Sequence, residues 1–279
     1  MRLVRQLFHG FLVGLAGLLP GLCGSTLLVL FGIYRPLTAA LAHPFADFRS
    51  NLRRFGLFFL AAGAGVLVGS RALAATFARH ETATLFLFMG FMLGVLPDLF
   101  RQARRTGGHP AGWLAFAGMF LLCLGLAAAQ DRLVPRGEPL AGHWSIWLAA
   151  GAGIGLGSIV PGASVAFLLI YFGIYHPLLD GVARLDPRIL GPVILGAGAA
   201  ILLFARAAHW LFQEAEGAAT RGVLGLVVGS LWLVYPGWPG GRAGWICLGL
   251  LAGGFALSAL LNRLAPPETA GPMGCPGSK

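Results

Sequence analysis

The sequence predicts an all-α integral membrane protein of two inverted repeats, each a re-entrant helical hairpin followed by about three transmembrane helices. Composition, an internal duplication and the placement of charge carry this prediction. Of the 279 residues, 57% are hydrophobic and 11% are charged, and the mean hydropathy is +0.79. This is too little charge to cover a soluble globule of this length. We therefore expect the chain to pass through a bilayer several times.

One motif occurs twice. Residues 14–37 read GLAGLLPGLCGSTLLVLFGIYRPL and residues 155–178 read GLGSIVPGASVAFLLIYFGIYHPL, with 12 of the 24 aligned positions identical. An ungapped match of this length indicates two copies of one unit. At an offset of 135 the match continues through Gly63 and Gly198, Arg71 and Arg206, Phe77 and Phe212, Glu81 and Glu216, Gly90 and Gly225, and Gly94 and Gly229. We expect a first repeat at 1–139 and a second at 140–279, integrated in one membrane domain.

Apolar segments give the expected order of the helices. Six have about the length of one crossing, or fall short by a few residues: 55–78, 85–96, 112–129, 189–212, 222–235 and 243–261. Two others, 8–34 and 144–175, are too long for one crossing and are broken near the middle by Pro-Gly. Each fits two half-helices that descend to mid-membrane and return to the same side. Non-helical backbone at that depth must lie inside protein or face water.

Charge placement favours the re-entrant arrangement. With a cytoplasmic N-terminus and a re-entrant first segment, two Arg-rich loops, at 35–54 and 101–105, lie in the cytoplasm, and the charge-balanced loop 130–143 lies outside. This obeys the positive-inside rule. If both long segments crossed fully, the same start would place both Arg-rich loops outside. Re-entrance leaves three crossings per repeat, so the second repeat must be inverted.

The expected binding chemistry lies at the two hairpin tips, Pro20-Gly21 and Pro161-Gly162. A new half-helix follows each break and begins with small or hydroxyl residues, which are Gly24, Ser25 and Thr26 in the first copy and Ser164 in the second. Helix starts carry unpaired N–H groups and a partial positive charge, so two of them facing one cavity would bind an anion. The alternative is that these breaks only let helices pack or kink in lipid.

Duplicated polar residues are further candidates. Arg71 and Arg206 lie in the last third of equivalent apolar segments. Each either binds a phosphate through its planar guanidinium or reaches the lipid headgroups from near a helix end. Arg35 and His176 share one repeat position at the expected cavity mouth, and the preceding Tyr34 and Tyr175 are candidates for the same site or for interfacial anchors.

Several classes of protein are disfavoured by what the sequence lacks. It has no paired carboxylates, no Ser-His-Asp order, no Walker loop and no H-E-x-x-H motif. Four scattered cysteines, with no C-x-x-C pair, indicate neither a metal site nor a disulfide framework. We expect a transporter with no cofactor and no metal, driven by a gradient or by the distribution of its substrate.

These motifs resemble a known family. The block PGLCGSTLLVLFGIYRPL resembles the P-G-x-S-G-G-T-x-x-x-x-x-G-x-Y-E signature of the DUF368 family, the bacterial polyprenyl-phosphate translocases, and PGASVAFLLIYFGIYHPL is similar to that family's second copy. The matching residues are Pro20, Gly21, Gly24, Thr26, Gly32 and Tyr34, then Pro161, Gly162, Ser164, Gly173 and Tyr175. The chain departs from the family at Cys23, Ser25 and Val165, and at Arg35 and His176, which replace an acidic residue.

The resemblance implies a flippase that returns undecaprenyl phosphate from the outer to the cytoplasmic leaflet of the bacterial inner membrane for reuse in envelope synthesis. Its implied partners are the polyprenyl phosphate lipid and the bilayer, with no nucleic acid. A lipid phosphate keeps its tail in the bilayer, so the protein shelters only the charged headgroup, and helix starts and arginines would offset the cost of desolvation. A transporter or channel for a small soluble anion would use the same tips. A membrane enzyme acting on lipid phosphates is the other class left open.

Overall fold

The structure is a computed structural model. It describes residues 2–22, 27–28, 30–33, 37, 48–105, 110–133, 143–159 and 166–264. Within these ranges all regular secondary structure is helical, as the hydropathy predicted. Four helical stretches are long and apolar enough to cross a membrane, and they are Phe55–Arg105, Pro187–Phe204, Gly217–Val234 and Arg242–Leu264. The protein is a multi-pass membrane protein, with shorter apolar helices beside these four.

Helix α4 (Phe48–Arg105) is bent in its middle. His80 leaves the helical conformation, with φ −142° and ψ 55°, between the two segments that the sequence predicted as separate helices. Beyond the bend the helix continues through Pro97 to its end at Arg105, farther than the apolar segment 85–96 indicated. The 51-residue apolar part of α4 thus exceeds the roughly 20 residues that one crossing needs.

A similar bend joins α9 (Pro187–Glu214) to α10 (Glu216–Val234). Ala215 lies between them with φ −132° and ψ 41°. Positions 80 and 215 differ by 135, which is the offset of the sequence match. Both bends therefore fall at equivalent positions of the sequence match, with closely similar backbone angles.

Helix α1 (Arg2–Ala16) packs parallel to the first half of α4. A Cβ atom at Gly10 would lie 2.4 Å from the carbonyl oxygen of Phe58, and one at Gly14 would lie 2.0 Å from that of Ala62. No side chain fits at either glycine. Small residues of this kind let two helix backbones approach closely inside a membrane.

Helix α6 (Trp144–Ile159) packs parallel to α9 in the same way. A Cβ at Gly151 would lie 2.1 Å from the carbonyl oxygen of Val193, and one at Gly155 would lie 2.6 Å from that of Ala197. From one contact to the next, the residue number increases along both helices, so the starts of α6 and α9 lie at the same end of this pair.

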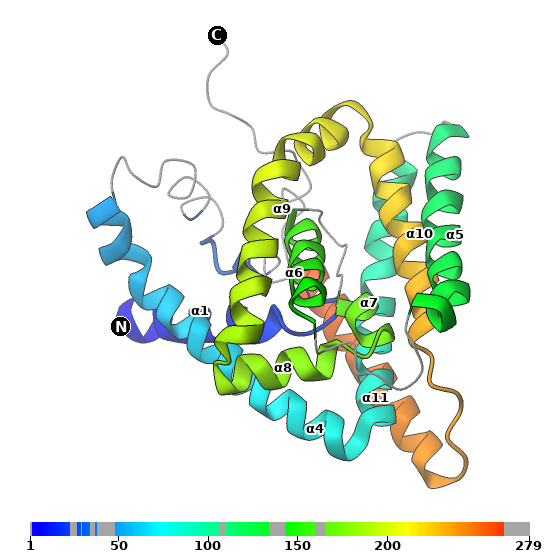
Figure 1. Ribbon diagram of the computed structural model, residues 1–279, viewed down its shortest axis with the longest axis horizontal. Coiled ribbons are helices and arrows are strands. Elements are labelled where there is room, and N and C mark those ends of the chain that lie inside the picture. Colours follow the sequence, from blue (N-terminus) through cyan, green and yellow to red (C-terminus); the bar gives the residue numbers. More distant parts are fainter. Residues whose placement is uncertain are drawn as a thin grey trace.

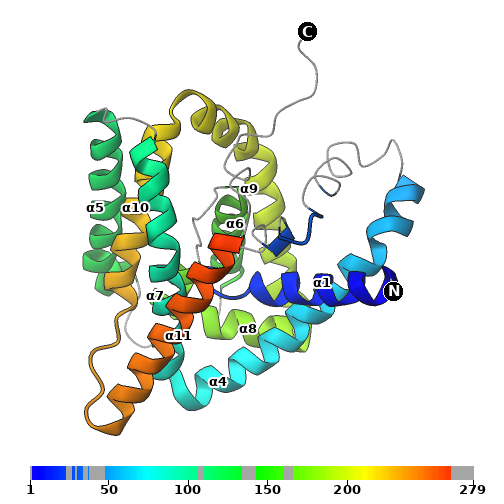
Figure 2. The same cartoon turned by 180° about the vertical axis from the view of Figure 1, so that it is seen from behind.

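Helix α5 (Pro110–Leu133) packs parallel to α10. A Cβ at Gly225 would lie 2.3 Å from the carbonyl oxygen of Phe116, and one at Gly229 would lie 2.8 Å from the Cβ of Cys123. Figures 1 and 2 show α5 and α10 side by side at one end of the molecule, with α1 at the other.

Helix α11 (Arg242–Leu264) packs parallel to the second half of α4. A Cβ at Gly90 would lie 2.2 Å from the carbonyl oxygen of Leu251, and one at Gly94 would lie 2.6 Å from the Cβ of Ser258. The helix that ends each half of the chain therefore packs on the other half, because α5 contacts α10 and α11 contacts α4.

The core lies where α4, α10 and the two short helices α7 (Ala166–Tyr171) and α8 (Tyr175–Arg184) meet. Its fully buried side chains include Phe88, Phe167 and Leu179. Helix α7 packs on α10, and α8 packs on α4 and α9 (Figure 1), so each short helix contributes a buried face to the core.

Candidate functional site

The first Pro-Gly break lies against the second half of α4. Pro20 is fully buried. Gly21 has φ +81°, a conformation that favours glycine, and a Cβ there would lie 2.7 Å from the backbone nitrogen of Met92 and 2.7 Å from the carbonyl carbon of Phe91. Conformation and packing therefore require glycine at this position, apart from any contact with a substrate.

Both copies of the motif end in the same turn. Gly32 and Gly173 have φ of +68° and +69°, and the residue after each glycine donates its backbone N–H back to a carbonyl five positions earlier. These two bonds, both 2.8 Å long, join Ile33 to Leu28 and Ile174 to Leu169. This is the hydrogen bond of a helix ended by a left-handed glycine. It accounts for the glycine of F-G-I-Y in both copies.

Tyr175 connects this second turn to the chain before the first Pro-Gly break. Its side chain is buried, and its hydroxyl donates a hydrogen bond to the carbonyl oxygen of Leu18, two residues before Pro20. Its ring lies edge-on to Phe77 and Phe88, with centroids 5.9 and 6.2 Å away. The structure therefore places Tyr175 inside the protein, where the second copy of the motif contacts the first.

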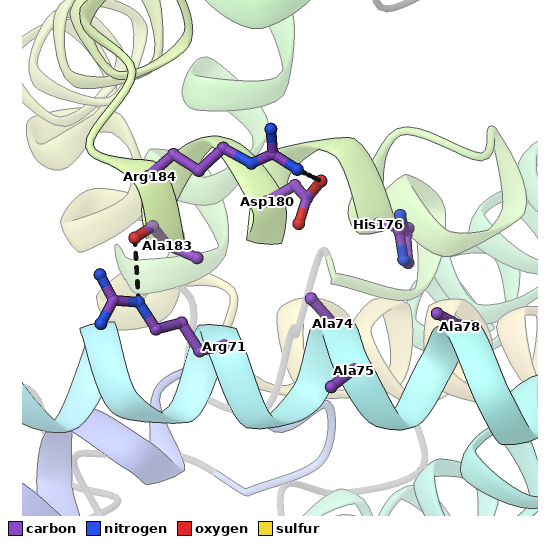
Figure 3. Close-up of a pocket in the computed structure, with 8 residues that line it drawn as sticks. All are labelled: Arg71, Ala74, Ala75, Ala78, His176, Asp180, Ala183 and Arg184. Carbon is purple, nitrogen blue, oxygen red and sulfur yellow. Dashed lines mark hydrogen bonds and ion pairs between the residues drawn. The ribbon is translucent and has the colours of Figure 1, made fainter.

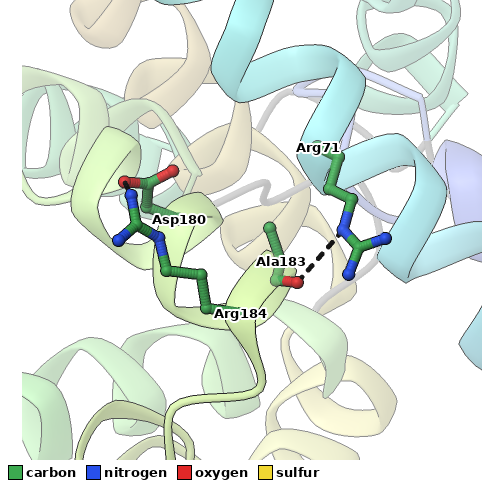
Figure 4. A network of polar contacts seen from close by, with 4 residues as sticks. All are labelled: Arg71, Asp180, Ala183 and Arg184. Atoms are coloured by element: carbon green, nitrogen blue, oxygen red, sulfur yellow. Dashed lines mark hydrogen bonds and ion pairs between the residues drawn. The ribbon is translucent and has the colours of Figure 1, made fainter.

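Arg71 crosses from α4 to the end of α8. Its Nε donates a 3.2 Å hydrogen bond to the carbonyl oxygen of Ala183, shown in Figures 3 and 4. The last carbonyls of a helix have no partner within the helix, and a cation there is favourable because of the helix dipole. One identified role of Arg71 is thus to bind the C-terminal end of α8, which closes at Leu185 with φ +55°.

A groove of about 460 Å³ lies between α4 and α8. Arg71 and three alanines of α4 form one wall (Figure 3), and four residues of α8 form the other. His176, Asp180 and Arg184 are spaced four residues apart, which places them on one face of α8. Arg184 forms an ion pair with Asp180, with 3.2 Å between Nη2 and Oδ2.

Among the other predicted site residues that the structure describes, Pro20, Gly21 and Tyr175 do not line this groove. Gly24, Ser25, Thr26, Tyr34, Arg35, Pro161, Gly162 and Ser164 lie outside the described residues. Arg206 lies in α9, and its side chain falls outside the described part of the chain. The hairpin tips as an anion site therefore stay a prediction.

Sequence reasoning did not single out three polar residues that the structure brings forward. Asp180 and Arg184 lie one and two turns beyond His176, and that helical spacing is the signal that points to them. Arg221 precedes the predicted segment 222–235, yet its side chain is only 5% exposed. Its Nη2 donates to the carbonyl oxygen of Ala103, and no spacing in the sequence indicates this contact.

Comparison with known proteins gives the family. The model of a family described as undecaprenyl phosphate translocase-like matches residues 2–109 and 111–243, which include both copies of the motif. A polyprenyl-phosphate transporter of Staphylococcus aureus is 24% identical over 278 residues, 93% of this chain and 96% of the relative. One of Vibrio cholerae is 23% identical over 252 residues, 85% of this chain and 79% of the relative. No solved structure matches the chain.

The match extends over most of the chain and confirms the resemblance that the two Pro-Gly motifs carried. This protein therefore belongs to the undecaprenyl phosphate translocase-like family, a family of membrane transporters and not of enzymes.

Proposed function

We propose that this protein is a flippase-type carrier that returns undecaprenyl phosphate from the outer to the cytoplasmic leaflet of a bacterial inner membrane. The observation that carries the proposal is the family match across both copies of the motif. Two relatives that align over most of their length are named as polyprenyl-phosphate transporters. Once it is back in the cytoplasmic leaflet, the lipid phosphate can serve again as a carrier in synthesis of the cell envelope.

We infer that the carrier is built of two inverted repeats. The start of α10 lies at the end of α4, because Arg221 binds the carbonyl of Ala103. At the opposite end, the ring of Tyr235, just beyond α10, lies 6.2 Å from that of Phe86 near the bend in α4. Helix α10 therefore runs antiparallel to the second half of α4, which is its counterpart in the sequence match. Opposite directions of equivalent helices support inversion.

The parallel pairs support re-entrance. Because Gly151 lies beside Val193 and Gly155 beside Ala197, α6 and α9 begin at the same end. The chain between them must return to the end where α6 starts. The α1 and α4 pair imposes the same return on residues between Gly14 and Phe48.

The proposed headgroup site is formed by the two hairpin tips with the duplicated polar residues around them. It comprises Pro20, Gly21, Gly24, Ser25, Thr26, Tyr34 and Arg35, then Pro161, Gly162, Ser164 and Tyr175, with Arg71 and Arg206 as phosphate partners. Helix starts stabilise an anion through their free N–H groups and the helix dipole. The lipid tail remains in the bilayer, so the site has to neutralise only one or two charges.

A leaflet-resolved measurement of undecaprenyl phosphate tests this function. Cells that lack the protein should accumulate the lipid phosphate in the outer leaflet, and restoring the gene should return it to the cytoplasmic leaflet. Two results together would favour the alternative of a small-anion transporter. The leaflet distribution of the lipid phosphate would be unchanged, and soluble phosphate would compete with the lipid phosphate for the protein.

A further inference from the structure

We propose that the groove between α4 and α8, which shares Arg71 with the proposed headgroup site, is a docking site for a phosphate monoester on an amphipathic lipid. This proposal rests on the proposed transport function, because it supplies the place where a lipid headgroup first meets the protein. The groove is open and has a volume of about 460 Å³. Its two walls come from the two halves of the chain, α4 from the first and α8 from the second.

Two arginines lie at one end of the groove, one on each wall. Figure 4 shows Arg71 and Arg184 on either side of Ala183. The hydrogen bond to the Ala183 carbonyl uses only Nε of Arg71 and orients its guanidinium group. The bond leaves the two Nη groups of Arg71 as further donors, and binding through two N–H groups is the strong form of arginine binding to phosphate.

The ion pair between Arg184 and Asp180 allows exchange of one anion for another. Their side chains are 77% and 43% exposed, so water screens the pair and it contributes little to stability. A phosphate dianion at Arg184 would replace a single carboxylate charge. Two guanidinium groups against one carboxylate leave a net charge of +1 on these three side chains of the groove.

The other part of the groove is apolar. Ala74 and Ala78 are one helical turn apart on α4, and with Ala75 they line the wall beside the arginines. Methyl groups do not bind an inorganic ion, whereas they offer a contact surface to the first carbons of a lipid tail. An end with two arginines beside an alanine-lined wall therefore matches a phosphate that carries a hydrocarbon chain.

Equilibrium binding to the purified full-length protein in detergent tests the groove, with farnesyl phosphate as the probe. Arg184→Gln should weaken binding by about tenfold, the cost of one charge-assisted hydrogen bond. Asp180→Asn should tighten it by up to about fivefold, because it removes the competing carboxylate. Arg188→Gln is the matched control, since Arg188 is exposed four residues beyond Arg184 and outside the groove. Unchanged thermal unfolding of all three variants would exclude misfolding.

The directions of these changes decide the matter. Equal weakening by Arg184→Gln and Arg188→Gln would show general attraction by surface charge and overturn the site. Weaker binding in Asp180→Asn would overturn it too.

Inorganic phosphate and farnesol are two further probes, and competition by either as strong as by farnesyl phosphate would overturn the assignment to an amphipathic ligand. Transport is a separate readout, because unchanged binding in Arg184→Gln with normal flipping overturns the groove alone. If the wild-type protein does not flip the lipid although the variants change binding in the expected directions, the transport function alone is overturned.

Discussion

Nη2 of Arg221 donates a 3.0 Å hydrogen bond to the carbonyl oxygen of Ala103 and so joins α10 to the last turn of α4. The guanidinium carbon also lies 5.9 Å from the ring centroid of Trp113 at the start of α5. A buried cation is costly unless its donors have partners, and the carbonyls at a helix end are favourable partners. Arg221 thus holds three helices together at one end of the bundle.

Replacing this arginine should destabilise the bundle. We expect Arg221→Leu to lower the free energy of unfolding by about 2 to 3 kcal/mol, because it removes a charge-assisted bond to a buried carbonyl. Titration of the purified protein with a denaturing detergent measures the change. Arg101→Leu is the control, since Arg101 forms an exposed ion pair with Asp98 at 3.6 Å and its loss should cost less than about 1 kcal/mol. Equal losses in the two variants would contradict the role of Arg221.

Membrane topology tests the re-entrant hairpins. In a background without native cysteines, Ser50→Cys should be protected from an impermeant thiol reagent added outside the cell, and Gly137→Cys should react. The reason is that a re-entrant first segment returns residue 50 to the side of the N-terminus. Labelling of position 50 from outside would contradict a re-entrant first segment with a cytoplasmic N-terminus.

Two glycines with positive φ separate the effect of packing from that of backbone strain. Gly32→Ala should cost about 1 to 2 kcal/mol, the price of a left-handed backbone for alanine, since a Cβ there meets no described atom within 4 Å. Gly21→Ala should cost more, because its Cβ would overlap the backbone of Met92. The folded fraction in size-exclusion chromatography and the unfolding midpoint measure both changes. A Gly21→Ala protein as stable as Gly32→Ala would show that the backbone around the first Pro-Gly break adapts, and its transport rate would then report on the proposed headgroup site.

Conservative exchange at Arg71 distinguishes a guanidinium-specific role from attraction to headgroups. Lysine cannot bind the Ala183 carbonyl and also present two further donors in a fixed plane. We expect Arg71→Lys and Arg71→Gln both to impair transport of undecaprenyl phosphate, with Lys retaining more activity. If Arg71 only reached the lipid headgroups, lysine would serve as well. Near-normal transport in Arg71→Lys would therefore remove this residue from the phosphate site.

The sequence predicted the helices better than their partners. Helices α5, α9, α10 and α11 lie close to the predicted segments, because long apolar stretches have few alternatives in a bilayer. The duplication also indicated which residues are equivalent, such as Gly90 and Gly225. It did not indicate that Gly90 packs on Leu251 of the other half, since small residues mark a close helix contact and not its partner.

The site was predictable only in part. The Pro-Gly motifs identified the family, and the offset of 135 singled out Arg71. The contact from Arg71 to the Ala183 carbonyl depends on how α8 folds back onto α4, which involves residues 112 positions apart. The periodicity within one helical segment cannot indicate a contact between segments so far apart in the sequence. The four-residue spacing from His176 points to Asp180 and Arg184 as neighbours on one helix face, and only the packing of α8 on α4 shows that this face lines a groove with Arg71.

The position of α11 has a consequence for biogenesis. The glycine face of α4 at Gly90 and Gly94 is covered by α11, the last helix that the structure describes. Synthesis adds about 5 to 20 residues per second. Until α11 has left the ribosome, that face of α4 lacks the helix that covers it. A ribosome that stops before residue 242 would therefore release a protein with an open helix-binding surface, and quality-control proteases that survey the bilayer would have a defined feature to recognise.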